Sequence, residues 1–391
     1  MRGVGALLTE SVRERNRASR AFFDSAAECV ARAASDMARR FARGGRLLAL
    51  GSQHAATDAQ HAVVEFVHPV IVGKRALPAL DVSFSLGHKD IARLARPDDI
   101  VLGFAPPEGD RAVTAALCAA RTLGCLTVAL PGSDADYAIG APHSDPFIQQ
   151  ELIEVFYHTL WESVHVFLEH EATGFDAGRA SFLYPFLDGE PPDIEQLIRD
   201  VTQSVRAKAE QDEQLRQQTL QSQQQEISAA ATAMYQRIQS GGTLLLFGNG
   251  GSATDANDLA LDCMASPKGH QPIPAISLSS DAATLTAVAN DVGVEAMFLR
   301  QIMAFARPQD VALAISTSGG SVNVLSALAE ARRRGLLTVA VVGNDGGDIV
   351  RRRLADFAIV VRCDYIPRIQ EVQASLYHLL LDTMAELPPG A

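Results

Sequence analysis

The sequence predicts an α/β protein of two tandem domains, each a parallel sheet flanked by helices. Three observations lead to this prediction. Short apolar runs alternate with longer segments of helical periodicity. A glycine-rich turn at residues 248–252 separates an apolar run from a helix-forming segment, which is typical of a strand that leads into a helix. The first half of the chain also recurs in the second half, and 391 residues exceed one ordinary hydrophobic core.

The first half contains alternating strand and helix patterns. Residues 8–43 are rich in Ala, Arg, Glu and Phe and predict one or two helices. Beyond them, short apolar runs predict strands, and amphipathic segments predict helices that cover both faces of a parallel sheet. The predicted strands are residues 44–51, 78–85, 99–104 and 125–130, and the predicted helices are residues 53–68, 111–123 and 146–170.

The two predicted domains are separated where this alternation stops. Residues 171–192 predict a linker, and residues 193–238 predict a long helix with a Gln-rich stretch. Spaced Leu, Val and Ile residues in that stretch favour a solvated helix over disorder. The predicted domains are therefore residues 1–170 and residues 193–391.

The second half repeats the first half in order. Residues 241–248 match residues 44–51, since both begin with two glycines, continue with an apolar run and end with a glycine. Three further pairs of segments match in the same order, which indicates two copies of one domain. These pairs are residues 56–59 and 253–256, residues 96–99 and 307–310, and residues 148–158 and 368–378.

The composition is that of a soluble globular protein, with 47% hydrophobic and 20% charged residues. A formal net charge of −12 argues against a nucleic-acid partner, because such a partner needs a basic surface. No apolar run has the length of a membrane span and the N-terminus lacks a signal-peptide core, so we expect a cytoplasmic protein without a membrane partner. The five cysteines form no CxxC pair and predict buried free thiols.

The glycine turn at residues 248–252 is a candidate anion site, because such a turn points free backbone N–H groups at an anion. A second candidate anion site follows the predicted strand that ends near residue 315. Ser316, Thr317, Ser318 and Ser321 lie between this strand and a predicted helix, with two glycines among them. Hydroxyls at a strand–helix turn, with glycines that free the backbone, can surround an anion. An ordinary helix cap is the alternative, but four hydroxyls in six residues exceed what capping needs.

Four ordered motifs, GNGGS, SLSSDAATLTAVANDVG, ISTSGGSVNVL and RIQEVQASLYH, resemble the sugar isomerase (SIS) domain of phosphoheptose isomerases. The resemblance covers about residues 200–385, and more loosely residues 10–170. It implies two SIS domains in tandem, each a flavodoxin-like three-layer sandwich with a helical N-terminal segment. It also implies the aldose–ketose isomerisation of sedoheptulose 7-phosphate and D-glycero-D-manno-heptose 7-phosphate. The substrate-binding residues that it implies are Asn249, Gly250, Ser252, Ser316, Thr317, Ser318, Ser321 and Gln370.

The first copy has lost this phosphate-binding apparatus. Pro106, Pro107, Glu108 and Asp110 stand where the second copy has its hydroxyl and glycine residues. Prolines lack the N–H donor, and carboxylates repel a phosphate. The first copy also lacks a counterpart of residues 281–293. We therefore expect it not to bind a sugar phosphate by itself.

A metal set is implied by the resemblance in the first copy. Family members with zinc bind it through a His and a Glu four residues apart and a Gln and a His eight residues apart. Residues at this spacing share a helix face, so two helices can hold one ion. A hydrogen-bonded pair without metal is the alternative reading. The implied zinc ligands are His61, Glu65, Gln150 and His158, whereas the second copy has Asp258, Asp262, Gln370 and His378.

The acid–base pair is also implied by the resemblance. Isomerisation through an enediol needs a base that moves a proton between adjacent carbons and an acid that serves the oxygens. Glu65 and His158 fill these positions in the first copy, and Asp262 and His378 are their counterparts in the second. Pro367 stands where the family pattern has Asp, which departs from the resemblance.

The sites of this family lie where subunits meet in a tetramer. A chain with two copies is therefore expected to form a homodimer, a pseudo-tetramer of SIS domains whose site combines both copies. The sequence leaves three functions open: a sugar-phosphate isomerase, a regulatory protein that binds a sugar phosphate, and a scaffold whose metal is structural.

Overall fold

The computed structural model describes residues 4–71, 73–85, 88–171 and 193–388. Of the predicted linker at residues 171–192, only Glu171 lies within the described residues. The chain forms two compact units, Arg17–Gln211 and a unit of Met1–Asn16 with Asp212–Ala391. Two long helices, α1 (Val4–Ala42) and α6 (Ile194–Gln239), are each divided between the units. The boundaries of the compact units thus lie inside helices, whereas the boundaries of the sequence repeat lie between helices.

The Arg17–Gln211 unit contains a five-stranded parallel sheet in the order β2-β1-β3-β4-β5. Alternate residues of a strand point to opposite faces, and both faces of this sheet are buried. Leu47 and Ala49 of β1 join the core formed with α1 and α5, while Leu48 and Leu50 join the core formed with α4. Its strands are β1 (Leu47–Gly51), β2 (Ala79–Asp81), β3 (Ile100–Phe104), β4 (Leu126–Leu130) and β5 (Tyr137–Ala138), and its helices include α2 (Ala55–Val67), α3 (His88–Leu94), α4 (Arg111–Thr122) and α5 (Pro146–Glu171).

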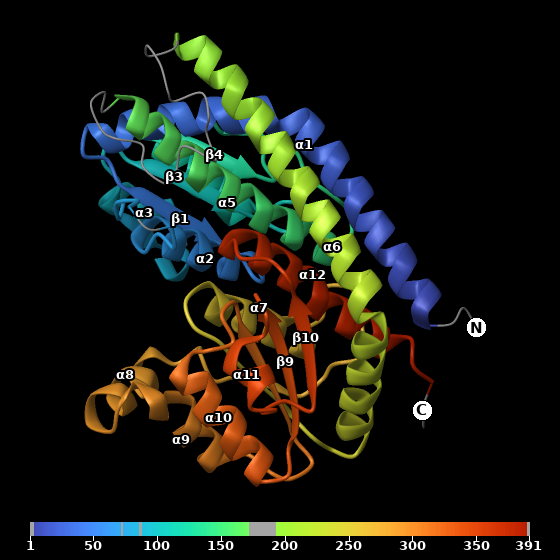
Figure 1. Cartoon of the computed structure of the whole chain (residues 1–391). Coiled ribbons are helices and arrows are strands. Elements are labelled where there is room, and N and C mark those ends of the chain that lie inside the picture. Colours follow the sequence, from blue (N-terminus) through green and yellow to red (C-terminus); the bar gives the residue numbers. More distant parts are fainter. Residues whose placement is uncertain (1–3, 72, 86–87, 172–192, 389–391) are drawn as a thin grey trace. The chain divides into compact units, whose positions relative to one another are not determined.

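The other unit contains a second five-stranded parallel sheet, in the order β10-β9-β8-β6-β7. Helices α9 and α10 lie together and form a core with one face of this sheet (Figure 1). The strands are β6 (Leu244–Phe247), β7 (Ala275–Ser277), β8 (Val311–Ser316), β9 (Leu337–Gly343) and β10 (Phe357–Val361), and the helices include α7 (Gly251–Met264), α8 (Ala282–Asp291), α9 (Met297–Phe305), α10 (Val322–Arg333), α11 (Gly347–Arg351) and α12 (Ile366–Ala385).

Both sheets have the strand order 2-1-3-4-5 in their own numbering, which is the flavodoxin-like order. The predicted fold class is therefore confirmed. In this order the chain reverses direction across the sheet between the first and third strands, and ligands bind at the carboxyl ends there. The sites are thus expected after β1 and β3 in one unit and after β6 and β8 in the other.

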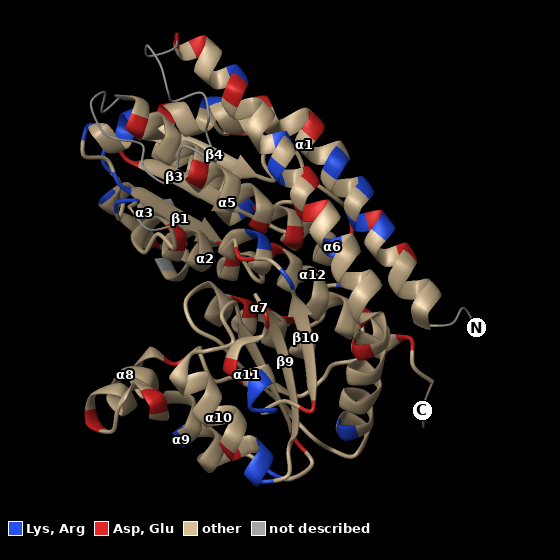
Figure 2. Ribbon diagram, viewed as in Figure 1, with Lys and Arg blue, Asp and Glu red and all other residues tan. Residues whose placement is uncertain are grey.

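Charge is distributed as this fold requires. The central strands carry no Lys, Arg, Asp or Glu, whereas both signs are interspersed along α1 and α6 (Figure 2). Within the described residues, no helix has the length and apolar character that crossing a membrane requires. All five cysteines are free thiols, of which Cys125 and Cys263 are buried.

Candidate functional site

The turn between β6 and α7 presents backbone donors. Gly250 has a φ of 57°, and a Cβ on Gly248 would lie 2.4 Å from the Ser252 carbonyl oxygen, so both positions need glycine. Ser279 holds the turn, because its Oγ accepts from the Gly248 N–H at 3.2 Å. Among the described residues, the N–H groups of Gly250, Gly251 and Ser252 have no acceptor. The start of α7 is therefore open to an anion.

The turn between β8 and α10 has a similar form. Gly319 has a φ of 60°, and a Cβ there would lie 2.2 Å from the Gly346 carbonyl oxygen. Two hydroxyls shape the turn: Ser316 Oγ accepts from the Gly319 N–H at 3.1 Å, and Ser318 Oγ accepts from the Gly320 N–H at 3.2 Å. In the described chain, the N–H groups of Thr317, Ser318 and Ser321 have no acceptor.

These two turns are neighbours, because β6 and β8 pair directly with Phe247 opposite Ala314. Their side chains also meet: Asn249 Nδ2 donates to Asn323 Oδ1 at 3.0 Å, and Asn323 Nδ2 donates to Asn249 Oδ1 at 2.8 Å. The two turns together are called the cradle below, comprising residues 248–252 and 316–321. It gathers all the predicted substrate-binding residues except Gln370, which is buried on α12.

Asn323 is not among the substrate-binding residues that the sequence predicts. The signal was available, because Asn is a poor helix former and stands at the second residue of α10. What the sequence cannot indicate is that its amide reaches a turn 74 positions earlier.

The predicted acid–base residues of this unit form a buried cluster between α7 and α12. His378 Nε2 lies 3.0 Å from Asp262 Oδ2 and 4.0 Å from Asp258 Oδ2, and the Tyr377 hydroxyl donates to Asp258 at 3.4 Å. Burial, together with the Asp262 carboxylate, raises the pKa of the adjacent Cys263 thiol, so this cysteine stays protonated. The structure thus brings Asp262 and His378 together as predicted by the family pattern.

This cluster lies far along α7 from the cradle. Asp262 is eleven residues after Gly251, and an α-helix rises about 1.5 Å per residue, so about 16 Å of helix separates them. A heptose 7-phosphate spans only about 10 Å from phosphorus to its carbonyl end, given bonds of about 1.5 Å. A sugar phosphate in the cradle therefore does not reach Asp262 of the same unit.

The predicted metal ligands of the Arg17–Gln211 unit lie between α2 and α5. One ligand atom from each of His61, Glu65 and His158 lies within 4.8 Å of the other two, and all three residues are buried. His61 Nε2 is 3.8 Å from Glu65 Oε1, and the two imidazole rings meet edge to face at 5.3 Å. Two imidazoles and a carboxylate are a donor set that zinc accepts.

Gln150 lies beside this trio. Its Nε2 donates to Asp58 Oδ1 at 3.2 Å. Asp58 lies on α2, about one helical turn before His61. Its buried Oε1 has no hydrogen-bond partner among the described residues, which suits a fourth oxygen ligand. The four predicted residues therefore fit a zinc ion.

Glu154 is a further buried carboxylate beside these residues that the sequence pattern did not single out. It has no exposed surface, and it lies on α5 midway between Gln150 and His158. The spacing Gln150, Glu154 and His158 at every fourth residue was visible as a polar row on an apolar helix.

The first copy's turns keep the backbone form of the cradle but not its donors. Gln53 has a φ of 53°, close to that of Gly250, and Ser83 Oγ accepts from the Gly51 N–H at 3.1 Å. At the second turn, Asp110 accepts from Ala112 and Val113 at 2.7 and 3.0 Å. A carboxylate thus occupies the N–H groups that an anion would need at the start of α4.

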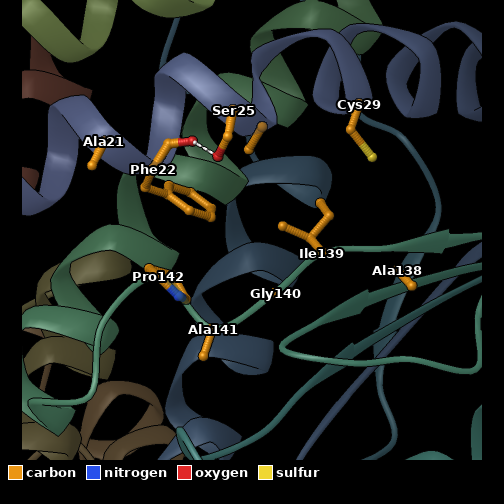
Figure 3. A pocket seen from close by; sticks show the side chains of 10 residues that line it. Ala21, Phe22, Ser25, Cys29, Ala138, Ile139, Gly140, Ala141 and Pro142 are labelled. Atoms are coloured by element: carbon orange, nitrogen blue, oxygen red, sulfur yellow. Dashed lines mark hydrogen bonds between the residues drawn. The ribbon is translucent and has the colours of Figure 1, made fainter.

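A separate pocket of about 350 Å³ lies between α1 and residues 138–142 (Figure 3). Ser25 at its edge donates back to the Phe22 carbonyl at 2.8 Å, within its own helix. The pocket carries no charged side chain, so it offers no acid–base chemistry. It is lined by Ala21, Phe22, Ser25, Ala26, Cys29, Ala138, Ile139, Gly140, Ala141 and Pro142.

Two solved structures resemble nearly the whole chain. The C-terminal domain of glucosamine-fructose-6-phosphate aminotransferase from Francisella tularensis is 12% identical with a TM-score of 0.57, and the match covers 97% of this chain and 95% of that one. Tagatose-6-phosphate ketose/aldose isomerase from Escherichia coli is 14% identical with a TM-score of 0.56, and the match covers 96% and 92%. At these identities the likeness shows the fold alone.

Sequence relatives are much more similar over one copy. A family model for the SIS domain matches residues 209–343. The phosphoheptose isomerase of Pelobacter propionicus is 46% identical over 153 residues, 39% of this chain and 80% of that protein. The phosphoheptose isomerase of Helicobacter pylori is 39% identical over 165 residues, 42% of this chain and 85% of that protein. The chain therefore belongs to the phosphoheptose isomerase family of SIS-domain sugar-phosphate isomerases.

Proposed function

We propose that this protein interconverts sedoheptulose 7-phosphate and D-glycero-D-manno-heptose 7-phosphate, or a closely related pair of sugar phosphates. One observation carries the proposal: two adjacent glycine turns at the switch point of the second sheet present N–H groups that have no acceptor among the residues that the structure describes. The names of the sequence relatives supply the substrate class, a heptose phosphate, and the family resemblance of the motifs supplies this particular pair.

The cradle holds the phosphate in this proposal. The N–H groups of Gly250, Gly251 and Ser252 point from the start of α7, where the helix dipole also favours an anion. The N–H groups after β8 and the exposed Ser318 hydroxyl add donors from the second turn. No basic side chain is required, which agrees with the acidic chain.

Proton transfer is assigned to Glu65 and His158. The reaction needs a base that removes a proton from the carbon beside the carbonyl and returns it to the neighbouring carbon. Asp262 is beyond the reach of a sugar held in the cradle of its own unit, so we propose that Glu65 is the base and His158 the acid. Asp262 and His378 would then be structural.

Zinc is proposed at His61, Glu65, Gln150 and His158. When bound, it would supply a Lewis acid that polarises a sugar oxygen. A carboxylate has two oxygens with about four lone-pair sites, so Glu65 can ligate through one oxygen and accept a proton at the other. We further propose that the chain works as a homodimer.

The experiment that tests the function is incubation of the purified protein with sedoheptulose 7-phosphate, with and without zinc, followed by analysis of the aldose product. Native protein should form the aldose. Ser318→Ala should weaken turnover mainly through KM, Glu65→Ala should abolish it, and Asp262→Asn should retain it. Ser133→Ala, at an exposed serine far from the cradle in the sequence, is the matched control for Ser318→Ala.

Two outcomes would contradict the proposal. Full turnover in Glu65→Ala would exclude Glu65 as the base. Absence of aldose with and without zinc, while the sugar phosphate still binds, would favour the regulatory function over the isomerase.

A further inference from the structure

The two amide side chains that join the cradle turns form a closed pair. Asn249 and Asn323 exchange two hydrogen bonds, of 3.0 and 2.8 Å. Asn323 lies in the first turn of α10 and is only 3% exposed, whereas Asn249 is exposed at the turn after β6. A buried amide and an exposed amide thus link two segments that lie 74 residues apart in the sequence.

The orientation of both amides follows from one backbone group. The Val324 N–H donates to Asn323 Oδ1 at 3.0 Å, so the atom at that position must be the oxygen. Asn323 Nδ2 then has to face Asn249 Oδ1, and Asn249 Nδ2 has to face Asn323 Oδ1. The helix backbone therefore determines the orientation of Asn249 through Asn323.

The hydrogen-bond capacity of the pair is unevenly used. Asn323 Oδ1 accepts twice, from Val324 and from Asn249, so both its lone pairs are occupied. Within the described part of the chain, Asn249 uses one of its two N–H groups and one of its two lone pairs. The exposed amide keeps one donor and one acceptor, which is the pair of functions that a sugar hydroxyl or a phosphate oxygen can use.

We infer that Asn323 is a positioning residue for the sugar-phosphate site. It holds the Asn249 amide in one orientation and fixes the spacing of the two turns before the ligand arrives. Such pre-organisation improves affinity by reducing the entropy lost on binding. This inference rests on the proposed function of the cradle, and it assigns the ligand contact to Asn249 alone.

A double-mutant cycle tests this role, with inorganic phosphate and sedoheptulose 7-phosphate as probes and calorimetric Kd as the measurement. Asn249→Ala and Asn323→Ala should each raise Kd about tenfold. If Asn323 acts through Asn249, the double variant should bind no more weakly than Asn249→Ala alone. In turnover assays Asn323→Ala should raise KM with little change in kcat.

Two further variants separate positioning from general damage. Asn323→Ser keeps a residue that suits a helix start and an acceptor for Val324, so it should fold and show the same loss of affinity. Asn257→Ala removes another part-buried amide, which accepts from Ser277 at 2.6 Å, and should leave the Kd unchanged. Circular dichroism checks that each variant is folded.

The inference is overturned if Asn323→Ala and Asn323→Ser keep the native Kd, or if the double variant is weakened about a hundredfold, the product of the single effects. It is also overturned if the native protein binds neither probe. If the double-mutant cycle shows that Asn323 acts through Asn249 but no aldose product forms, the proposed isomerase is rejected and the positioning role stands.

Discussion

Gln53 holds a backbone conformation that its counterpart in the other copy gives to glycine. Its φ of 53° lies in the left-handed region, as does the φ of 57° at Gly250. The left-handed conformation costs an L-residue about 1–2 kcal/mol. The turn has therefore kept its shape in a copy that no longer presents the donors, because the direct hydrogen bond from Gly51 to Ser83 still fixes it.

Gln53→Gly should consequently stabilise the protein. Relief of the left-handed strain exceeds the greater chain entropy of glycine, about 0.5–1 kcal/mol, so a net gain of about 0.5–1 kcal/mol is expected. Urea denaturation measures it. Gln218→Gly, at an exposed position within α6, should instead lose about 1 kcal/mol. Equal losses at both positions would refute the strain at Gln53.

Asp99 and its counterpart Asp310 have the same structural role in the two copies. Although burial opposes its charge, hydrogen bonds from the Arg46 guanidinium and from the Arg46 and Arg96 N–H groups hold the pKa of Asp99 below its ordinary value of 3.8. A lowered folded pKa means that the ionised carboxylate contributes stability above about pH 4, which is lost as pH falls through the folded pKa. Asp310 accepts from Thr243 and Arg307 in the same way.

Asp99→Asn should therefore lower the unfolding free energy by about 1–3 kcal/mol at pH 7. The difference from native protein should shrink as the pH falls below 4. Thermal unfolding followed between pH 7 and pH 3 measures both. Asp98→Asn, at the exposed neighbouring position, should have little effect, and a loss of similar size there would contradict the argument.

The sequence predicts which side chains lie together best where their arrangement depends on local spacing. The glycines and hydroxyls of the cradle follow strands directly, so their positions could be identified from the motif and the pattern together. Asn323 and Glu154 were missed for different reasons. The role of Asn323 depends on a contact across the sheet, whereas Glu154 stands in a visible polar row whose meaning depends on the helix opposite.

Paired helices are the structural element that carries the proposed metal and acid–base residues and their counterparts in the second copy. Helices α2 and α5 place His61, Glu65 and His158 within 4.8 Å, and α7 and α12 place Asp262 and His378 in contact. The first pair presents two imidazoles and a longer carboxylate. The second forms a direct hydrogen bond of 3.0 Å that already satisfies the imidazole.

Zinc binding should accordingly be confined to the first helix pair. We expect about one zinc per chain after reconstitution, measured by a chelator titration or by elemental analysis, and none in His61→Ala. Zinc should also raise the Tm of the native protein and leave that of His61→Ala unchanged. Asp258→Asn is the matched control at the corresponding position. Loss of zinc in that variant, or retention in His61→Ala, would reject the assignment.

Most elements were predictable because periodicity and strand length gave strong signals. The predicted helix over residues 8–43 is one helix, and the strand expected at residues 78–85 is shorter, ending at Asp81 before a helical turn at Ser83–Ser85. Helix α3 and strand β5 were not predicted. They are short, so neither contains enough residues for a period to emerge.

At the scale of the whole chain, the repeat predicts two domains whose bounds differ from those of the two compact units. A repeat compares sequences, and it assigns α1 wholly to one copy and α6 wholly to the other. Packing divides these helices at Asn16 and at Gln211, because the apolar residues of α1 after Asn16 and of α6 before Gln211 join the core of the Arg17–Gln211 unit. Which core a helical turn joins depends on tertiary contacts that no local pattern records.

Several exposed apolar side chains on the second unit are candidates for the interface of the proposed homodimer. Helix α8 buries none of its residues, and four large apolar side chains near it and on α9 are between 44% and 56% exposed. They are Val292, Val294, Met303 and Phe305. Association with a second copy, as the homodimer proposal supplies, would remove this apolar surface from water.

Light scattering should therefore give twice the chain mass of 41.8 kDa. Val294→Asp places a charge among these side chains and should shift the protein to monomers if they form the interface, because burying an unpaired carboxylate is unfavourable. Glu295→Asp, at the next position, keeps the local charge and should remain dimeric. A native mass of one chain would reject the homodimer, and a dimeric Val294→Asp would place its interface elsewhere on the chain. If Val294→Asp is monomeric and forms less aldose, while Glu295→Asp remains dimeric and keeps its activity, the activity depends on the dimer.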